Sequence, residues 1–419
     1  MAKFLVENKG PLRGEVSISG AKNSVLPIMA ATLLCNEECI IQDVPALRDV
    51  EVMCQILESL GVKVDADFSN NRLSLNATEI LHNETPPELA KRMRASILTM
   101  GPILARKGSA VVALPGGCAI GARPIDLHLK GFEALGAEII FGEHHVEARA
   151  EKLKGNRIYL DYPSVGATEN IITAAVFAEG TTIIENVAEE PEIVDLANYL
   201  NKMGAKIKGA GTDTIKIEGV ERLHGTTHTV IPDRIETGTF MVAAAITRGD
   251  VLIKNVVPDH VRPVIAKLTE CGCVVEDTID GLRVRGDVNP LVATDIKTLP
   301  YPGFPTDMQS QFMALLTTVE GQSTVIETVF ENRYMHISEL NRMGADITHD
   351  GRSAIINGGA PLHGSSVMST DLRAGAALVL AGLVASGTTE VTEIYHIERG
   401  YTEFVDKLRG IGAEIRKED

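Results

Sequence analysis

A single cysteine stands in an open, glycine-rich segment of this 419-residue chain, "LPGGCAIGARPID" at residues 114–126. Most free cysteines are small buried hydrophobes, yet Cys118 lies among glycines and five residues before an arginine, Arg123. A nearby guanidinium and backbone N–H groups favour the thiolate, which is the reactive form of cysteine. The pattern therefore predicts a loop that carries a reactive thiol, although the residues alone also allow a structural turn.

Charged side chains stand where several helices are expected to begin. Lys22 lies in "SGAKNS", Arg94 in "KRMRAS" and Asp307 in "FPTDMQ". Asp371 lies in "STDLRAG", two residues before Arg373. Helix N-termini carry unpaired N–H groups and a partial positive charge, so they attract anions. Cations and carboxylates at such places could bind a phosphorylated ligand and move protons.

Each of these residues also has a simpler interpretation, which the sequence leaves open. Lys22, Arg94 and a further candidate, Arg399 in "HIERGY", are solvated cations if they face water. Asp307 could be only a helix cap, and Asp371 could form an ion pair with the arginine two residues on. A common site is favoured by the shared place of Lys22, Arg94, Asp307 and Asp371 in different copies of one repeat.

The elements that position these residues form an internal repeat of about 70 residues. Six times a helix end is followed by a glycine and a strand, as in "FEALGAEI" from Phe132 and "LNRMGADI" from Leu340. Each glycine suits the left-handed position that ends a helix. The glycines, spaced 75, 68, 68, 72 and 68 residues apart, are Gly61, Gly136, Gly204, Gly272, Gly344 and Gly412. The Cys118 segment has no counterpart in the other copies, and part of the longer first spacing falls there.

Each copy also contains a second helix that is rich in Ala, Gly, Met and Leu on nearly all sides. A helix that is apolar on most faces is buried, so we expect helices inside and sheets outside. These helices begin at "GAKNSVLPIMAA", "KRMRASILTMG", "SVGATENIITAAV", "DRIETGTFMVAAA", "PTDMQSQFMALL" and "STDLRAGAALVLA". The predicted fold class is α/β, with three repeats in each of two domains.

The predicted domains are residues 22–230 and residues 231–419 together with 1–21, with the active site in the cleft between them. The strand in "LRGEVSIS" from Leu12 is expected to precede the first buried helix. We also expect it to close the last repeat, which would pair the two ends of the chain.

Composition narrows the class of protein. The 40 basic and 56 acidic residues give a net charge of −16, which argues against a general nucleic-acid binder. No apolar run reaches the ~18 residues that span a bilayer, and the N-terminal residues lack a signal-peptide pattern. Six cysteines without a close framework indicate a reducing compartment, so we expect a cytosolic protein without a membrane partner.

The other cysteines are expected to be structural. Cys271 and Cys273 resemble a metal-binding pair but align with small core residues of other repeats, and Cys35, Cys39 and Cys54 fall in helices and a strand. "EHHVE" at 143–147 is expected to be a solvated hairpin rather than a metal cluster. We therefore expect no metal and no cofactor.

With these residues assembled, the chain resembles the enolpyruvyl transferase family over its whole length. The resemblance rests on "GAKNS", "MRASI", "LPGGCAIGARPIDLH", "SVGATE", "PDRIETGTF", "PTDMQ", "FENRYMH", "TDLRAG" and "HIERGY". The motifs are similar to those of members that act on UDP-N-acetylglucosamine, and they show no departure. The resemblance implies two inside-out α/β domains of three repeats each, as in EPSP synthase.

The resemblance also implies a reaction. The enolpyruvyl group of phosphoenolpyruvate moves to the 3′-hydroxyl of UDP-N-acetylglucosamine by addition and elimination, with release of phosphate, at the start of peptidoglycan synthesis. This chemistry needs an acid that protonates carbon, a base for the hydroxyl, and cations around a carboxylate and a phosphate. No metal is required. The family implies neither an oligomeric state nor a regulator that could be assigned here.

Roles carry over from the family to matching positions. Cys118 is implied as the acid, able to form a covalent adduct with phosphoenolpyruvate and to react with fosfomycin, and Asp307 as the base. The implied phosphoenolpyruvate ligands are Lys22, which is also counted as catalytic, with Asn23, Arg123 and Arg399. The implied nucleotide-sugar ligands are Arg94, Arg123, Pro124, Ile125, Asp126, Leu127, Ser164, Val165, Gly166, Asp307 and Val329, and Asp371 and Arg373 complete the polar wall.

Two alternatives remain. A 5-enolpyruvylshikimate-3-phosphate synthase shares the implied fold and donor, but a Lys-Ser start and an Asn-Ala-Gly-Thr-type loop would be expected where this chain has Lys22-Asn23 and the Cys118 segment. A non-catalytic relative that binds nucleotide sugar would not need Cys118, Lys22, Asp307 and Arg399 together.

Overall fold

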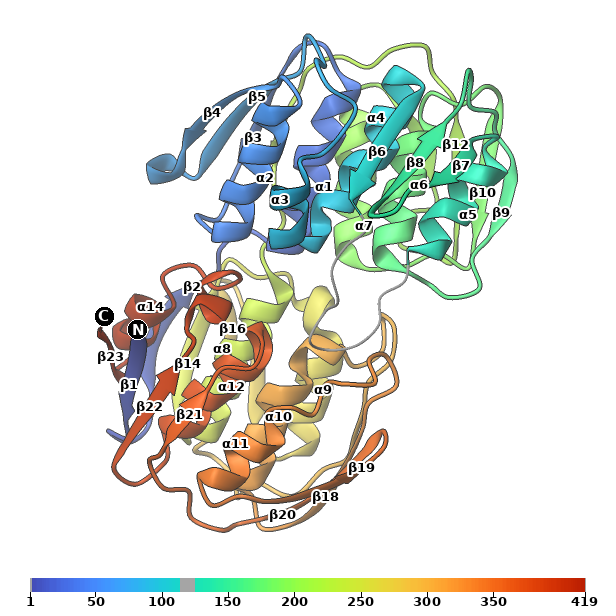
Figure 1. The fold of residues 1–419 in the computed structure, drawn as a ribbon. Helices are drawn as coiled ribbons and strands as arrows, with labels where there is room; N and C mark the ends of the chain where they lie inside the picture. Colours follow the sequence, from blue (N-terminus) through green and yellow to red (C-terminus); the bar gives the residue numbers. More distant parts are fainter. Residues whose placement is uncertain (1, 114–124, 419) are drawn as a thin grey trace. The chain divides into compact units, whose positions relative to one another are not determined.

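The structure is a computed structural model that describes residues 2–113 and 125–418. Within these residues the chain forms two compact units (Figure 1). We call residues 20–113 with 125–231 the Lys22 unit and residues 2–19 with 232–418 the Asp307 unit. The chain passes between them after Ser19 and after Ile231.

Three sheets belong to the described part of the Lys22 unit. Their strand orders are β13-β3-β5-β4, β11-β12-β10-β9 and β6-β8-β7. The strands are β3 (Glu38–Gln42), β4 (Lys63–Asp67), β5 (Arg72–Asn76), β6 (Ser109–Ala113), β7 (Glu138–Phe141), β8 (His145–Arg149), β9 (Arg157–Tyr159), β10 (Thr181–Glu185), β11 (Lys206–Lys208), β12 (Thr214–Glu218) and β13 (Thr227–Thr229). In each sheet the last two strands of a repeat form an antiparallel hairpin, for example β4 with β5 and β11 with β12.

The described part of the Asp307 unit has the same construction. Its sheets have the orders β15-β16-β14-β2, β17-β18-β20-β19 and β21-β22-β1-β23. The strands are β1 (Lys3–Glu7), β2 (Arg13–Ser17), β14 (Asp250–Lys254), β15 (Val274–Thr278), β16 (Gly281–Arg285), β17 (Ile296–Lys297), β18 (Gly321–Ile326), β19 (Asp346–Asp350), β20 (Ser353–Gly358), β21 (Ser366–Met368), β22 (Thr388–Thr392) and β23 (Glu414–Glu418).

The repeated apolar helices are buried, as predicted. In the Lys22 unit they are α1 (Lys22–Ala31), η3 (Arg94–Thr99) running into α4 (Met100–Lys107), and α6 (Val165–Ala175). In the Asp307 unit they are α8 (Arg234–Ile246), α10 (Gln309–Thr317) and α12 (Leu372–Gly382). Every residue from Ile235 to Ile246 of α8 is buried, while strands such as β16 bury alternate residues only. The helices therefore form the core of each unit and the sheets its outer layer, which confirms the predicted class.

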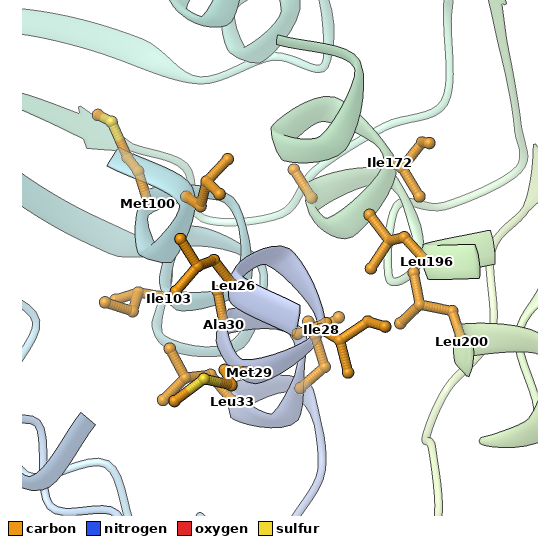
Figure 2. Close-up of a cluster of buried hydrophobic side chains, with 14 of the residues drawn as sticks. Leu26, Ile28, Met29, Ala30, Leu33, Met100, Ile103, Ile172, Leu196 and Leu200 are labelled. Atoms are coloured by element: carbon orange, nitrogen blue, oxygen red, sulfur yellow. The ribbon is translucent and has the colours of Figure 1, made fainter. Parts of the chain in front are cut away.

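The Lys22 unit has a single apolar core around α1. Figure 2 shows Leu26, Ile28 and Met29 of α1 among buried side chains of the neighbouring helices, including Ile172 of α6 and Leu196 of α7 (Pro191–Lys202). Most of α1 packs in this apolar core, which fixes its depth, and Ser24 near its start donates to Asp195 of α7 at 2.5 Å.

The remaining helices are amphipathic and end where the repeat predicts. Those that precede a repeat glycine are α2 (Arg48–Ser59), α5 (Asp126–Ala134), α7, α9 (Arg262–Glu270), α11 (Ile337–Arg342) and α14 (Phe404–Gly410). Each is followed by one of the six repeat glycines, whose φ angles lie between 93° at Gly136 and 106° at Gly204. Residues with a Cβ rarely adopt this conformation, so the glycines end these helices. The short helices are η1 (Thr32–Leu34), η2 (Phe68–Asn70), α3 (Pro87–Arg92), η4 (Pro258–Val261), η5 (Thr306–Met308) and α13 (Tyr395–Glu398).

The N-terminal strands differ from the prediction in one respect. β2, which lies within the "LRGEVSIS" segment, pairs in parallel with β14 and does not close the last repeat. The strand that does so is β1, which lies antiparallel to both β22 and β23. The prediction of which strand pairs the chain ends was therefore wrong. β2 lies parallel to β14 in the same way that β13 lies parallel to β3. After each of these two strands, β2 and β13, the chain crosses into the other unit.

Candidate active site

Lys22 is the first residue of α1 and is buried rather than solvated. Its Nζ lies 3.2 Å from Oδ2 of Asp49, and the two side chains are 11% and 5% exposed. Asp49 lies in the first turn of α2, where a carboxylate is favoured by the helix dipole. Asn23 follows on α1 and is half-buried. A buried ammonium at an N-terminus that has no side-chain cap is suited to binding an anion.

Arg94 and the start of α6 are brought together around His128. Burial and then the charge of Arg94 lower the pKa of His128 to about 3. Asn170 lies with its Nδ2 2.9 Å from His128 Nδ1, and since the amide donates, the proton of the neutral imidazole is on Nε2. A Cβ at Gly166 would stand 3.2 Å from the His128 ring. The glycine therefore lets the first turn of α6 approach the imidazole closely.

The other nucleotide-sugar candidates of this unit lie at two helix starts. Ser164 is the N-cap of α6, and its side chain accepts a hydrogen bond from Ala167 N. Val165 is half-buried, while Ile125 is buried just before α5. The two remaining candidates are the exposed Asp126 and the half-buried Leu127, which are the first two residues of α5.

Asp307 lies between two buried arginines in the Asp307 unit. Its Oδ1 is 2.8 Å from Arg333 Nη1 and its Oδ2 is 3.2 Å from Arg373 Nη2. The arginine side chains are 5% and 2% exposed, whereas Asp307 is 27% exposed. Two adjacent guanidinium groups favour the ionised carboxylate. Asp307 caps neither η5 nor α10 with its side chain, so the helix-cap interpretation does not apply.

Glu327 ties Val329 to the residue before Asp307. This buried carboxylate accepts hydrogen bonds from the Val329 and Phe330 N–H groups at 2.8 and 3.2 Å. It also accepts from the Thr306 and Thr298 hydroxyls at 2.8 Å each. Thr306 in turn accepts from Arg333 Nη1 at 3.1 Å. The loop that carries Val329 and the turn that carries Asp307 are thus held by one side chain.

Asp371 caps α12 instead of pairing with the side chain of Arg373. Its Oδ1 accepts from Arg373 N at 2.8 Å and from Ala374 N at 3.1 Å. Arg399 is half-buried at the end of α13. Burial and then Arg399 lower the pKa of His396, which also senses the charge of Asp371. Asp371 and Arg399 therefore both lie close enough to His396 to affect its pKa.

Three predicted site residues lie outside the described part of the chain: Cys118, Arg123 and Pro124. Among the described candidates, the helix starts of the Lys22 unit carry Lys22, Arg94, Ser164 and Gly166. The helix starts of the Asp307 unit carry Asp307 and Asp371.

Sequence reasoning missed four polar residues that hold these side chains. Asp49, His128, Arg333 and Glu327 contact candidate residues but were not themselves predicted. Two of them fall within the motifs already quoted, His128 in "RPIDLH" and Arg333 in "FENRYMH". A charged or imidazole residue inside a family-like motif was the signal that could have found them.

The cysteines of the described residues are core side chains, as predicted. Cys35, Cys39, Cys54, Cys271 and Cys273 are all buried and free. "EHHVE" lies in the β7–β8 hairpin, as expected. In residues 2–113 and 125–418, no group of three or more His, Cys, Asp and Glu side chains is arranged to hold a metal ion. The same residues contain no helix long and apolar enough to cross a membrane.

Each unit taken by itself carries side chains suited to binding an anion or to acid–base chemistry. Each unit presents polar residues at the starts of buried helices, with a buried cation in Lys22 and an ionised carboxylate in Asp307. Such groups can neutralise a phosphate and accept a proton from a hydroxyl.

Known proteins resemble the chain along its whole length. The family described as "EPSP synthase (3-phosphoshikimate 1-carboxyvinyltransferase)" matches residues 6–408. The chain is 63% identical over 413 residues to UDP-N-acetylglucosamine 1-carboxyvinyltransferase 1 of Caldanaerobacter subterraneus subsp. tengcongensis, covering 99% of each. It is 60% identical over 421 residues to UDP-N-acetylglucosamine 1-carboxyvinyltransferase 2 of Carboxydothermus hydrogenoformans, covering 100% of this chain and 99% of that one.

Solved structures share the fold. The enolpyruvyl transferase NikO from Streptomyces tendae superposes with a TM-score of 0.88 at 25% identity, covering 99% of this chain and 98% of NikO. An EPSP synthase from Acinetobacter baumannii gives a TM-score of 0.78 at 20% identity over 100% of both chains. The second likeness concerns the fold alone.

Proposed function

The chain belongs to the EPSP synthase family of enolpyruvyl transferases, and we propose that it transfers the enolpyruvyl group of phosphoenolpyruvate to the 3′-hydroxyl of UDP-N-acetylglucosamine. The observation that carries this function is full-length identity of 57–63% to relatives named UDP-N-acetylglucosamine 1-carboxyvinyltransferase. The enzyme is a transferase of peptidoglycan synthesis, and we place it in the cytoplasm.

The reaction is an addition followed by an elimination. The sugar hydroxyl loses a proton and its oxygen bonds to C2 of phosphoenolpyruvate, while C3 gains a proton. The tetrahedral intermediate then loses a proton from C3 and expels phosphate from C2, which restores the double bond. Each proton transfer needs a positioned side chain, and the developing charges need fixed cations.

We assign Asp307 as the base that takes the hydroxyl proton. It is an ionised carboxylate with 27% of its side chain exposed, so a substrate can reach it. The two arginines hold its orientation but also stabilise its charge, which weakens a base. Productive proton transfer therefore requires that substrate binding loosens at least one of these contacts.

The cations are assigned to the anionic donor. Lys22, Asn23 and Arg399 are proposed to bind phosphoenolpyruvate together with Arg123, and Cys118 is proposed as the acid that protonates carbon. The buried state of Lys22 supports its part, because an ammonium shielded from water attracts a phosphate more strongly. The roles of Cys118 and Arg123, which lie outside the described residues, rest on the family motif alone.

The nucleotide-sugar site is assigned to the residues around His128 and Glu327. In the Lys22 unit these are the helix starts that carry Arg94, residues 125–127 and residues 164–166. In the Asp307 unit they are Asp307 and Val329, with Asp371 and Arg373 beside them. That the active site lies between the two units stays a prediction.

Two other functions are distinguishable by one assay. Phosphate release is measured from phosphoenolpyruvate with UDP-N-acetylglucosamine and, separately, with shikimate 3-phosphate. Release with the nucleotide sugar alone is expected. Release with shikimate 3-phosphate alone would identify a 5-enolpyruvylshikimate-3-phosphate synthase, and release with neither would identify a non-catalytic binding protein.

A further inference from the structure

A buried tyrosine lies behind the Asp307–Arg373 pair. Tyr401 is 3% exposed, and its ring centroid lies 5.3 Å from Cζ of Arg373. A guanidinium over an aromatic face within about 6 Å is attracted by the ring. One side of Arg373 therefore contacts Asp307 and another is held by the Tyr401 ring.

The phenol hydroxyl joins the buried helices α8 and α10. It lies 2.9 Å from Oγ1 of Thr239 on α8 and accepts from Nε2 of Gln311 on α10 at 3.3 Å. Thr239 uses its only proton to donate to Ile235 O at 2.8 Å, so it must accept from Tyr401. Burial raises the pKa of the phenol, which keeps the hydroxyl protonated and able to donate.

The same network reaches the backbone of the proposed base. Gln311 Nε2 donates to Asp307 O at 2.9 Å, and the Gln311 Oε1 accepts from Ser310 Oγ at 3.0 Å, which fixes the amide orientation. Tyr401 is thus linked to Asp307 in two ways, through Arg373 to its carboxylate and through Gln311 to its carbonyl. No other described residue contacts Arg373 through a ring.

We propose that Tyr401 is a positioning residue, which sets the guanidinium of Arg373 and the turn of Asp307 in the geometry that the transfer reaction requires. The proposal rests on the proposed function for its kinetic consequence, but its structural consequence does not depend on it. The Tyr401 ring contacts Arg373, which in turn contacts Asp307. The proposed role therefore needs no contact between Tyr401 and the substrate.

The test compares isosteric variants. Tyr401→Phe keeps the ring and removes the hydroxyl, and Thr239→Val removes the hydroxyl that accepts from both Tyr401 and Gln311. Thr247→Val is the matched control, because Thr247 directly follows α8, is buried and donates to a carbonyl four residues back, Ala243 O, at 2.8 Å, but does not contact Tyr401. Phosphate release, thermal melting and crystal structures are measured for all three.

We expect Tyr401→Phe to lower kcat about tenfold, the effect of one lost neutral hydrogen bond on a barrier. The KM for phosphoenolpyruvate should stay within about twofold, because its proposed ligands lie outside the network. Thr239→Val should act in the same direction, and Thr247→Val should lower only the melting temperature. A kcat of Tyr401→Phe within twofold of wild type, or a loss that Thr247→Val reproduces, would overturn the proposal.

The crystal structures decide the proposal independently of turnover. Tyr401→Phe keeps the ring beside Arg373 but removes the hydroxyl link through Gln311, so the Asp307 turn should shift and with it the Arg373 Nη2 to Asp307 Oδ2 distance, which is 3.2 Å in the unaltered chain. An unchanged pair and turn would contradict the positioning role. If the unaltered enzyme releases no phosphate, the proposed function fails, while these structures still test Tyr401.

Discussion

Arg373 and Asp307 form an ion pair in which the cation is buried and the anion is not. The Nε and Nη2 atoms of Arg373 both lie 3.2 Å from Oδ2 of Asp307, and the side chains are 2% and 27% exposed. A buried guanidinium loses hydration and depends on its partner. The arginine is therefore fixed in the protein, whereas the carboxylate keeps one side available for a substrate.

Arg373→Lys should lower kcat/KM about tenfold to a hundredfold. Lysine keeps the charge but has one donor nitrogen in place of the fixed pair Nε and Nη2, and a hydrogen bond to a charged group contributes about 1.5–3 kcal/mol. Arg283→Lys is the control, since Arg283 makes a similar two-donor contact with Asp250, at 2.9 and 2.7 Å, on the exposed surface. Equal activity of the two variants would argue that the Arg373–Asp307 pair has no part in the reaction.

Lys22→Ala should raise the KM for phosphoenolpyruvate by at least about tenfold, because a shielded ammonium is a strong partner for a phosphate. The matched control is Lys130→Ala, which removes a lysine paired with Asp161 at 2.7 Å but 45% exposed. Exposed pairs contribute little, so this variant should behave as wild type. Binding is measured by initial rates and by titration calorimetry. Unchanged affinity in Lys22→Ala would remove Lys22 from the donor site.

Cys118→Ser should nearly abolish phosphate release while the melting temperature changes little. A hydroxyl is a far weaker acid and nucleophile than a thiol, and the glycine-rich sequence around Cys118 predicts a loop position with few core contacts. Mass spectrometry after incubation with phosphoenolpyruvate should locate an adduct on Cys118, and fosfomycin should block it. A large drop in melting temperature would favour the structural-turn interpretation instead.

The sequence predicts the parts of this fold that depend on local patterns. A glycine that ends each outer helix and an apolar run on every side of α8 or α12 are readable from neighbouring residues, and both are found. The pairing of β2 with β14 cannot be predicted from local patterns, since it depends on contacts between residues more than 230 positions apart in the chain.

The sequence predicts the candidate site to a similar degree. Asp307 and Arg373 were both predicted as site residues, but their mutual contact was not, because they are 66 positions apart on different helices. The alternative that the sequence left open was an ion pair between Arg373 and the nearby Asp371, but the Asp371 carboxylate instead caps the helix. Short sequence separation suggested that pair, whereas the cap holds Asp371 on backbone N–H groups.

His128 should make the protein less stable as the pH falls below about 6.5. Its folded-state pKa is about 3, lowered mainly by burial, so the unfolded chain takes up a proton first and stability is lost between pH 6.5 and 3. His128→Gln should therefore flatten the dependence by about 2 kcal/mol between pH 7 and 5. Urea unfolding at the two pH values measures this. His144→Gln, at an exposed position, is the control, and an equal effect of both variants would contradict the assignment.

Glu327→Gln should destabilise the Asp307 unit and impair turnover together. The carboxylate accepts from two hydroxyls and two backbone N–H groups, so an amide in its place turns an N–H toward at least one donor. A buried donor left without an acceptor costs about 1–3 kcal/mol. The released Thr306 and Val329 adjoin Asp307 and the proposed nucleotide-sugar site, so the KM for UDP-N-acetylglucosamine should rise as well. Urea unfolding and initial rates test both effects against Glu320→Gln, which alters an exposed carboxylate. A loss of stability with an unchanged KM would show that Glu327 supports the core but does not shape the sugar site.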